Sequence, residues 1–505
     1  MSSNAQPNDA PSAAVAQQGT TSALSSSTTP SASSSSTPSP LISVNAPSSS
    51  TTAAAPGTPQ QAKQSALAAS TANATPAVPE EEAISYVNQE GDWKYRKINL
   101  FKVMRGFVSQ LKPGQDLTKI SLPAECCTPY GLLEVMGSRE LAMFHLTFGM
   151  NKHQNNPMER FLAAVRFFFG TVRSERFDKK PWNPVLGETH ITYADVIYGE
   201  DGVGTTETLN GSSAAPGAKG GASAATTSSA AAASSSASAD TSSRSRSVFV
   251  GEQVSHHPPV SAFCLSNTRE DIQCQANVSF TVKFGGNTVT VATAGGLQII
   301  SKRFNETYEL TKCLPDMVVR NVVWGKKYIM WEGDVTMTCP QTGLTAFFKF
   351  KEKSSQNVVK GCIVQGDSDD PIIEMHGVCG EKIMYHYADQ PDDEFVLLDL
   401  TKEPSARIHY LPKSKLAPLS SVGVWEKVNK AIVDDDITLA DKEKKVIEQA
   451  QRERAKARLE AKAEYSGCYF DMTPDGIWSY KNNMELDNVL TVGAQSIDPG
   501  VESSE

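Results

Sequence analysis

Two adjacent histidines lie in the run Glu252-Gln-Val-Ser-His-His-Pro-Pro259, directly before two prolines. The segment ahead of this run, 247–251, reads Ser-Val-Phe-Val-Gly and is typical of a strand. Because Pro258 has no N–H to donate to a strand ladder, we expect the histidines to lie where a strand ends. Two imidazoles at such a position could bind a metal ion, assist a nucleophile or bind an anion.

The metal and hydrolase interpretations of this run lack supporting residues. Neighbouring side chains of a regular strand point to opposite faces, so His256 and His257 can share a metal ion only where the backbone leaves the strand. No third ligand lies at a usual spacing from them. Ser255 could be a nucleophile, but no nucleophile-elbow glycine pattern surrounds it. A phosphate monoester suits the pair best, because charged imidazoles make strong, charge-assisted hydrogen bonds to phosphate oxygens.

Two further segments carry groups that could converge on the same anion. The run Lys179-Lys-Pro-Trp-Asn-Pro-Val-Leu-Gly-Glu188 combines two lysines, an amide and a carboxylate, and two prolines fix its backbone. By itself this pattern also fits a rigid turn with a solvated lysine pair. Lys444, Glu448 and Arg452 follow one another at spacings of four residues and therefore share one stripe of a helix. Such spacing also arises by chance in charged helices.

Composition divides the 505 residues into parts that can fold and parts that cannot. Residues 1–82 are rich in Ser, Ala, Thr and Pro, and residues 203–247 are rich in Gly, Ala, Ser and Thr. Such segments bury too little apolar surface to offset the entropy cost of ordering them. We therefore expect a disordered tail over 1–82, a disordered insertion over 203–247 and a flexible acidic tail over 486–505. Residues 83–485 are enough for one large domain.

Net charge and cysteine usage narrow the classes of function. The net charge of −9 disfavours nucleic-acid binding, so any affinity for phosphate or anionic membranes must come from local basic clusters. The nine cysteines include no C-x-x-C pair and fit neither a disulfide framework nor a zinc pattern. The chain begins without the apolar core of a signal peptide and has no run long enough to span a membrane. We therefore expect a cytosolic protein.

Apolar spacing predicts helices towards both ends of the folded part and strands between them. From His190 to Tyr387, apolar and polar residues alternate with period two, and turn signals such as 285–287 separate the runs. Many short strands without intervening helices predict a large antiparallel sheet that closes into a barrel. A barrel wider than eight strands leaves an interior that side chains alone do not fill. Helices are predicted at 93–111, 130–143, 157–169 and 441–464.

The three motifs together resemble those of the oxysterol-binding-protein-related family of lipid transfer proteins. The run 252–259 matches that family's signature residue for residue, and 179–188 matches its K-K-P-x-N-P-x-x-G-E element. The stretch 444–452 resembles its K-x-x-x-E-x-x-x-R element, and the three stand in the family's order. The resemblance covers about 97–478. It implies an α+β fold in which a large antiparallel β-barrel encloses a lipid tunnel, with an N-terminal lid over 98–122, N-terminal helices and C-terminal helices.

The function implied by this resemblance is lipid transfer without catalysis or a cofactor. A short family member, built on the lipid-binding domain alone, would bind phosphatidylinositol 4-phosphate and exchange it for a sterol or phosphatidylserine. Such a protein is cytosolic and touches anionic membranes transiently. The implied head-group ligands are Lys180, Asn183, Glu188, His256, His257, Lys444, Glu448 and Arg452. The implied lid side chains are Ile98, Phe101, Met104, Phe107, Leu111, Leu117, Ile120 and Leu122.

Two other functional classes stay open at this point. One is a phosphoinositide or sterol sensor or scaffold that binds the same head group but moves little lipid. The other is a hydrolase that uses Ser255 with His256 or His257. The sensor needs the same site as a transporter, so a vesicle-to-vesicle transfer assay has to separate the two. Turnover of a lipid or ester substrate that is lost in Ser255→Ala would support the hydrolase, and binding without turnover would exclude it.

Overall fold

The computed structural model describes residues 85–87, 114, 116, 122–173, 179–199, 204–208, 213–214, 244–481 and 489–490. The predicted helix 93–111 and all the predicted lid side chains except Leu122 lie outside these residues. The described helices are η1 Ala124–Cys126, α2 Leu132–Met143, η2 Phe144–Lys152, α3 Pro157–Thr171, η4 Lys413–Lys415, α4 Ser421–Val433 and α5 Ile437–Ala461. The strands are β1 Cys127–Gly131, β2 Lys180–Trp182, β3 Thr189–Tyr198, β4 Gly204–Glu207, β5 Ser213–Ala214, β6 Arg244–His256, β7 Pro259–Asn267, β8 Ile272–Phe284, β9 Thr288–Ala294, β10 Leu297–Ser301, β11 Glu306–Leu310, β12 Asp316–Arg320, β13 Tyr328–Cys339, β14 Leu344–Lys353, β15 Gln356–Gln365, β16 Ile373–Val378, β17 Lys382–Tyr387, β18 Phe395–Asp399, β19 His409–Tyr410, β20 Phe470–Met472 and β21 Trp478–Tyr480.

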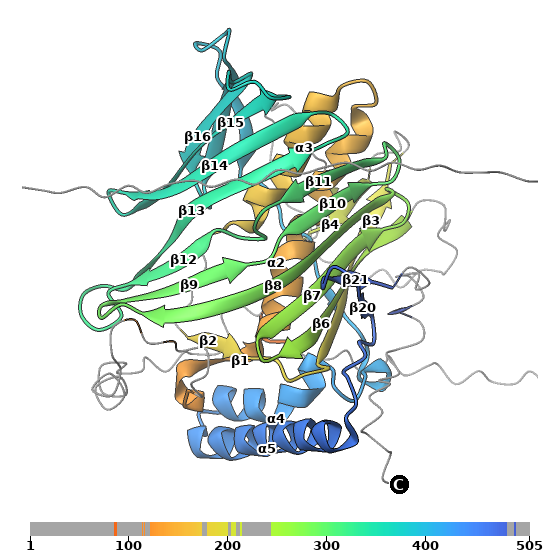
Figure 1. Cartoon of the computed structure of the whole chain (residues 1–505), viewed down its shortest axis with the longest axis vertical. Coiled ribbons are helices and arrows are strands. Elements are labelled where there is room, and N and C mark those ends of the chain that lie inside the picture. The colour runs from red at the N-terminus through yellow and green to blue at the C-terminus, as the bar shows by residue number, and fades with distance from the viewer. Residues whose placement is uncertain are drawn as a thin grey trace, which may run out of the picture. The chain divides into compact units, whose positions relative to one another are not determined.

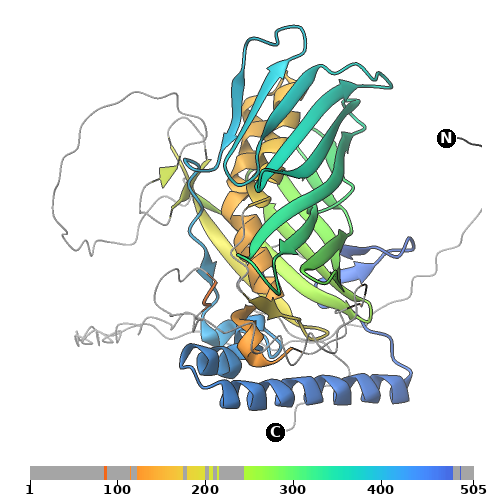
Figure 2. The same cartoon turned by 90° about the vertical axis from the view of Figure 1, so that its left-hand side faces the viewer.

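The strands from β3 to β19 form one sheet of 17 strands, which confirms the predicted barrel. Its order runs from β10 through β19 to β3 and on to β9, and pairings of β8 with β10 and of β9 with β12 join the two ends. The sheet curves around α2 and α3 (Figures 1 and 2). The predicted strands at 279–284, 288–292 and 346–351 lie within β8, β9 and β14. Alternating burial gives β8 and β14 one buried face, whereas most of β9 is half-buried.

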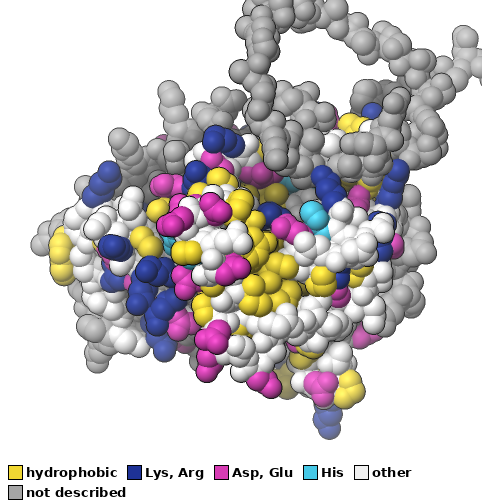
Figure 3. Space-filling model, turned by 90° about the horizontal axis from the view of Figure 1, so that it is seen from above, with side chains coloured by type: hydrophobic (Ala, Val, Ile, Leu, Met, Phe, Trp, Pro, Cys, Tyr) yellow, Lys and Arg dark blue, Asp and Glu magenta, His cyan; other side chains and the backbone are white. Residues whose placement is uncertain are grey.

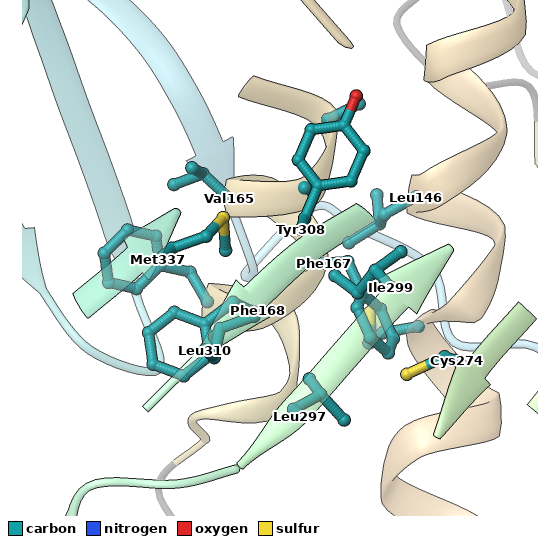
Figure 4. Close-up of a cluster of buried hydrophobic side chains, with 14 of the residues drawn as sticks. Leu146, Val165, Phe167, Phe168, Cys274, Leu297, Ile299, Tyr308, Leu310 and Met337 are labelled. Atoms are coloured by element: carbon teal, nitrogen blue, oxygen red, sulfur yellow. The ribbon is translucent and has the colours of Figure 1, made fainter. Parts of the chain in front are cut away.

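Helix α3 fills part of the barrel interior. It begins where the Asn156 side chain accepts a hydrogen bond from the backbone N–H of Glu159 at 3.2 Å, with Pro157 in the first turn. Figure 4 shows Phe167 and Phe168 of α3 among side chains of β10, β11 and β13. Both phenylalanines are fully buried. The predicted helices at 130–143, 157–169 and 441–464 are confirmed as α2, α3 and α5, with small shifts at their ends.

Two predicted boundaries are wrong. The disordered insertion was expected over 203–247, but Gly204–Glu207 forms β4 and β6 begins at Arg244. Both segments pair with β3 through backbone hydrogen bonds, which do not depend on apolar content. The flexible tail was expected from 486, but Val489 and Leu490 are buried and belong to the same hydrophobic cluster as Phe470 of β20 and Trp478 of β21. Two adjacent apolar residues are enough for this burial, and the acidic composition of the surrounding residues does not predict it.

A buried ion pair ties the start of α3 to the barrel wall. The Arg160 guanidinium donates two hydrogen bonds to the Glu306 carboxylate of β11, one of them from Nε at 2.8 Å. Arg160 also donates to the carbonyls of His153 and Gln154, each at 2.8 Å. The Tyr308 hydroxyl donates to the same carboxylate at 2.6 Å. These bonds satisfy charges that would otherwise be costly to bury.

Arg160→Met should lower the free energy of unfolding by about 3–5 kcal/mol, because it leaves the Glu306 carboxylate buried without its cation. Chemical denaturation followed by tryptophan fluorescence measures this loss. The double variant with Glu306→Gln should recover much of it, since the amide carries no charge. A single variant as stable as the wild type would show that this pair does not hold α3 in place.

Candidate functional site

An apolar cavity of about 770 Å³ lies between α2 and the strands of the barrel. This volume suits a small-molecule or lipid ligand. Four of the predicted head-group ligands, from β2, β6 and the segments that follow them, line it: Lys180, Asn183, His256 and His257. The apolar lining residues include Val135, Met136, Val278, Phe280, Val282, Val289, Val291, Leu314, Met317 and Trp331.

The two histidines lie at the turn between β6 and β7, as the prolines predict. β6 ends at His256 and β7 begins at Pro259. The two imidazole rings meet edge to face with their centroids 4.6 Å apart. His256 Nδ1 is buried and has no hydrogen-bond partner among the described residues. Burial, with a smaller effect from the neighbouring His257, lowers the pKa of His256.

Lys180 and Asn183 form a contact within the second motif. The Lys180 ammonium donates hydrogen bonds to Asn183 Oδ1 and, at 3.3 Å, to the Pro181 carbonyl. Burial lowers the pKa of Lys180, and the nearby cation Lys444 adds to this effect. Burial also lowers the pKa of Lys179, another residue of the cavity lining. Cations brought together out of water in this way are stabilised by an anion.

Aromatic stacking and backbone bonds hold this motif beside the histidines. The rings of Trp182 and Trp425 stack 5.1 Å apart at an angle of 6°. Trp182 Nε1 also donates to Asn429 Oδ1 at 2.8 Å, which ties the motif to α4. On the other side, Gln253 N donates to the Glu188 carbonyl at 2.8 Å, joining the motif to β6. The two loops are therefore positioned relative to each other by the folded domain.

Glu188 is fully buried, and the cavity lining does not include it among the described residues. Its carboxylate accepts hydrogen bonds from Val185 N at 2.9 Å, Ser421 Oγ at 2.7 Å and Trp425 Nε1 at 3.0 Å. Burial outweighs these bonds and raises the pKa of Glu188 to about 7. Its position is that of an internal support, and contact with a head group stays a prediction.

The third motif lies on one stripe of α5, as its spacing predicts. Glu448 pairs with Lys444 at 2.9 Å and with Arg452 at 3.5 Å. Lys444 is buried and close enough to Lys180 to affect its pKa, whereas the Arg452 side chain is 64% exposed. Among the described residues that line the cavity, none comes from α5. A direct role for these three residues in binding stays a prediction.

Sequence reasoning missed three residues with clear positions in the site. Gln253 lines the cavity, where its Oε1 accepts a hydrogen bond from Ser261 Oγ at 2.6 Å. Glu252 accepts hydrogen bonds from Cys468 N and Tyr469 N, each at 2.8 Å, and so fastens the C-terminal segment. Arg458 of α5 lies close enough to His256 to contribute to the lowering of its pKa. Gln253 and Glu252 belong to the histidine run itself, so their polar side chains beside the histidines were the signal that could have indicated these positions.

The described ends of the predicted lid contact the barrel beside the cavity. Gly114 N donates to the Phe284 carbonyl at 2.7 Å, and Asp116 forms a β-bridge with Lys283 at the end of β8. Asp116 and Leu122 line the cavity. Gly114 and Asp116 therefore lie beside β8, one of the strands that form the apolar wall.

Neither histidine of the motif belongs to a metal-type cluster in the part of the chain that the structure describes. Asp195, Glu207 and His409 do come within 4.8 Å of one another on β3, β4 and β19. However, Arg246 pairs with Asp195 at 3.2 Å, and Arg407 pairs with Glu207 at 3.4 Å. These ion pairs already neutralise the two carboxylates.

Comparison with known proteins finds one family model and several relatives that match most of the chain. A family model described as "Oxysterol-binding protein" matches residues 106–432. An oxysterol-binding protein homolog of Schizosaccharomyces pombe is 26% identical over 376 residues, which are 73% of this chain and 70% of that protein. Human oxysterol-binding protein-related protein 8 is 25% identical over 386 residues, or 74% of this chain and 38% of the human protein.

Solved structures share the fold. The ORD of Osh3 from Saccharomyces cerevisiae, in complex with PI(4)P, has a TM-score of 0.53 and 17% identity, and the match covers 82% of this chain and 95% of that one. The Osh1 ORD domain in complex with ergosterol has a TM-score of 0.55 and 19% identity, with 81% and 95% covered. No helix among the described residues is both long and apolar enough to cross a membrane. Because the family model spans residues 106–432 of 505, the chain belongs to the oxysterol-binding protein family.

Proposed function

We propose that this chain is a cytosolic lipid transfer protein that binds phosphatidylinositol 4-phosphate and exchanges it for a sterol or phosphatidylserine between membranes. The observation that carries the proposal is the convergence of Lys180, Asn183, His256 and His257 on one otherwise largely apolar cavity. The Osh3 structure in complex with PI(4)P and the Osh1 structure in complex with ergosterol support it by likeness of fold.

The apolar wall of the cavity supplies the driving force for extraction. A lipid that leaves a bilayer exposes its tails to water at about 0.8 kcal/mol per CH₂ group. A cavity lined by side chains such as Val278, Val289 and Met317 removes that penalty. If two lipids use the same cavity in turn, one displaces the other. A gradient of the phosphoinositide between two membranes can then drive transport of the second lipid.

Some polar residues are assigned to contact the head group, and others are assigned to hold those residues in place. We assign the 4-phosphate to the histidine pair and Lys180, and inositol hydroxyls to Asn183. Lys444 and Arg452 add positive charge from α5, and Glu448 holds both of them. Glu188 supports the loop from within, through its three internal hydrogen bonds.

The hydrolase alternative is disfavoured by the hydrogen bond of its proposed nucleophile. Ser255 Oγ donates to the Pro258 carbonyl at 2.7 Å. A carbonyl cannot act as a general base, so this bond does not activate the hydroxyl. The sensor alternative needs the same site as a transporter, and a vesicle-to-vesicle transfer assay separates the two.

The double variant His256→Ala/His257→Ala should lose extraction of phosphatidylinositol 4-phosphate from liposomes, because it removes two phosphate donors. It should retain extraction of the second lipid, whose tail contacts the unchanged apolar wall. Liposome extraction with labelled phosphoinositide, sterol or phosphatidylserine measures both and names the second lipid. His376→Ala is the control, because His376 is exposed on β16 and outside the cavity lining. Equal phosphoinositide extraction by the wild type and the double variant would refute the head-group assignment.

Affinity for the phosphoinositide should rise as pH falls from about 8 to about 6.5. Burial lowers the pKa of His256 in the ligand-free protein, so this ring is neutral at pH 7. A phosphate beside it raises that pKa, and binding therefore takes up a proton. The gain is at most about tenfold per pH unit for one proton. Titrations with a water-soluble, short-chain phosphoinositide measure it.

The phosphate's own ionisation near pH 6 opposes this trend, so the comparison with His256→Ala is decisive. That variant should show a flatter or inverted pH dependence. Parallel pH profiles for the wild type and the variant would exclude proton uptake by His256.

A further inference from the structure

The loop between β12 and β13 holds a tryptophan in solvent. This loop, 321–327, reads Asn-Val-Val-Trp-Gly-Lys-Lys, and Trp324 is 66% exposed. Tryptophan side chains are large and mostly apolar, so burying one stabilises the fold or the interface that contains it. The barrel does not bury this one, although it buries the Trp331 side chain seven residues further on. Single exposed apolar residues are common on protein surfaces, so the position of this loop and the charges around it have to indicate whether the indole meets a partner.

The exposure of Trp324 results from a loop whose shape is fixed. Asn287 Oδ1 accepts hydrogen bonds from the backbone N–H groups of Val323 and Trp324, at 3.0 and 3.1 Å. Its Nδ2 donates to Asn321 Oδ1 at 3.1 Å and to the Trp324 carbonyl at 3.2 Å. Asn321 Nδ2 in turn donates to the Lys326 carbonyl at 3.0 Å. Asn287, in the turn between β8 and β9, thus fixes the backbone around Trp324, and the indole projects from an ordered loop.

The loop lies at the edge of the lipid cavity. Val322 and Lys327, on either side of Trp324, both line that cavity. In Figure 1 the loop joins the left-hand ends of β12 and β13, beside the turn that joins β8 to β9. The described end of the lid contacts the same region, because Gly114 N bonds to the Phe284 carbonyl at the end of β8. A surface that docked here would therefore meet the cavity and its lid.

The charges around Trp324 indicate the chemistry of that surface. Lys326 is exposed beside it, and Lys283 is exposed at the end of β8. Asp116 forms a β-bridge with Lys283 and offsets one of these charges, so the described residues around the loop are positive on balance, in contrast to the net charge of −9 for the whole chain. An indole flanked by lysines matches the interface of an anionic bilayer, where tryptophan sits at head-group depth and lysines attract acidic lipids.

Other exposed aromatic residues differ from Trp324 in position or in charge. Phe347 of β14 is exposed on the same strand face as Lys349, but neither residue lines the cavity among the described residues. Figure 3 shows the end of the molecule away from α4 and α5, where acidic side chains border hydrophobic ones. Phe395 is 43% exposed, and it directly follows the acidic stretch Asp392-Asp-Glu394. Acidic neighbours repel an anionic bilayer. Phe395 therefore provides a matched control, an exposed aromatic residue in the opposite electrostatic setting.

We propose that the β12–β13 loop is a membrane-docking element. The Trp324 indole inserts at head-group depth into an anionic bilayer, Lys326 and Lys283 contact the acidic head groups, and the cavity edge is thereby placed against the membrane. This inference rests on the proposed function only in that the cavity has to meet a membrane. Trp324 itself is not among the described residues that line the cavity, so its docking role does not require head-group recognition.

The test is binding of the full chain to sedimenting vesicles of phosphatidylcholine with and without phosphatidylserine, free of phosphoinositide and sterol. Trp324→Ala should lower the bound fraction on acidic vesicles several-fold, and Lys283→Glu/Lys326→Glu should abolish the dependence on phosphatidylserine. Phe395→Ala should bind like the wild type. Unchanged binding of Trp324→Ala, or an equal loss in Phe395→Ala, would overturn the proposal.

A second measurement reports the depth of the indole. Acyl-brominated phosphatidylcholine quenches tryptophans that enter the bilayer. The tryptophan fluorescence of the wild type should be quenched and that of Trp324→Phe should not, and equal quenching of the two would contradict insertion.

Binding of a water-soluble, short-chain phosphoinositide should be unchanged in Trp324→Ala. If the wild type fails to bind that ligand, the proposed function is refuted while the vesicle comparison still decides the docking role.

Discussion

The buried carboxylate of Glu188 is the interaction on which the arrangement of the site depends. It accepts three hydrogen bonds, from the turn at Val185 and from Ser421 and Trp425 of α4. Its own backbone carbonyl accepts a bond from Gln253 in the histidine strand. One residue thus joins the lysine loop, a C-terminal helix and the barrel. A carboxylate is costly to bury, and its three donors offset part of this cost, although burial still raises the pKa of Glu188 to about 7.

This support allows cationic groups to gather where isolated ones would be unfavourable. Lys179 and Lys180 both have lowered pKa values through burial, and Lys444 acts on Lys180 in the same direction. The ligand-free site therefore stores electrostatic free energy that an anion releases on binding. Glu448 moderates the repulsion from α5 by pairing with two cations of that helix. If the proposed phosphate binds here, its affinity and the stability of the empty site oppose each other, because the same clustered cations determine both.

Local pattern predicted much of this protein, and long-range pairing accounts for what it missed. Two prolines predicted the strand end at His256, and period-two alternation predicted the barrel, because both effects act between neighbouring residues. The stack of Trp182 on Trp425 and the bonds from Glu188 to α4 join positions more than 230 residues apart, as the separation of 233 residues between Glu188 and Ser421 illustrates. No periodicity encodes such partners. The same limit explains the tail, where the burial of Val489 depends on a hydrophobic cluster that includes residues as distant in sequence as Ile191 and Val248.

The division of the cavity into an apolar wall and a polar end separates affinity from selectivity. Contacts with side chains such as Val291 and Met317 are non-directional, so the wall accepts tails of different shape at similar free energy. Hydrogen bonds from the lysine and histidine motifs are directional, so under the proposed function discrimination between lipids would arise where these residues line the cavity. A transfer protein needs this division, because it must release each lipid into a membrane as readily as it extracts it. Tight, specific packing along the whole tail would favour binding over exchange.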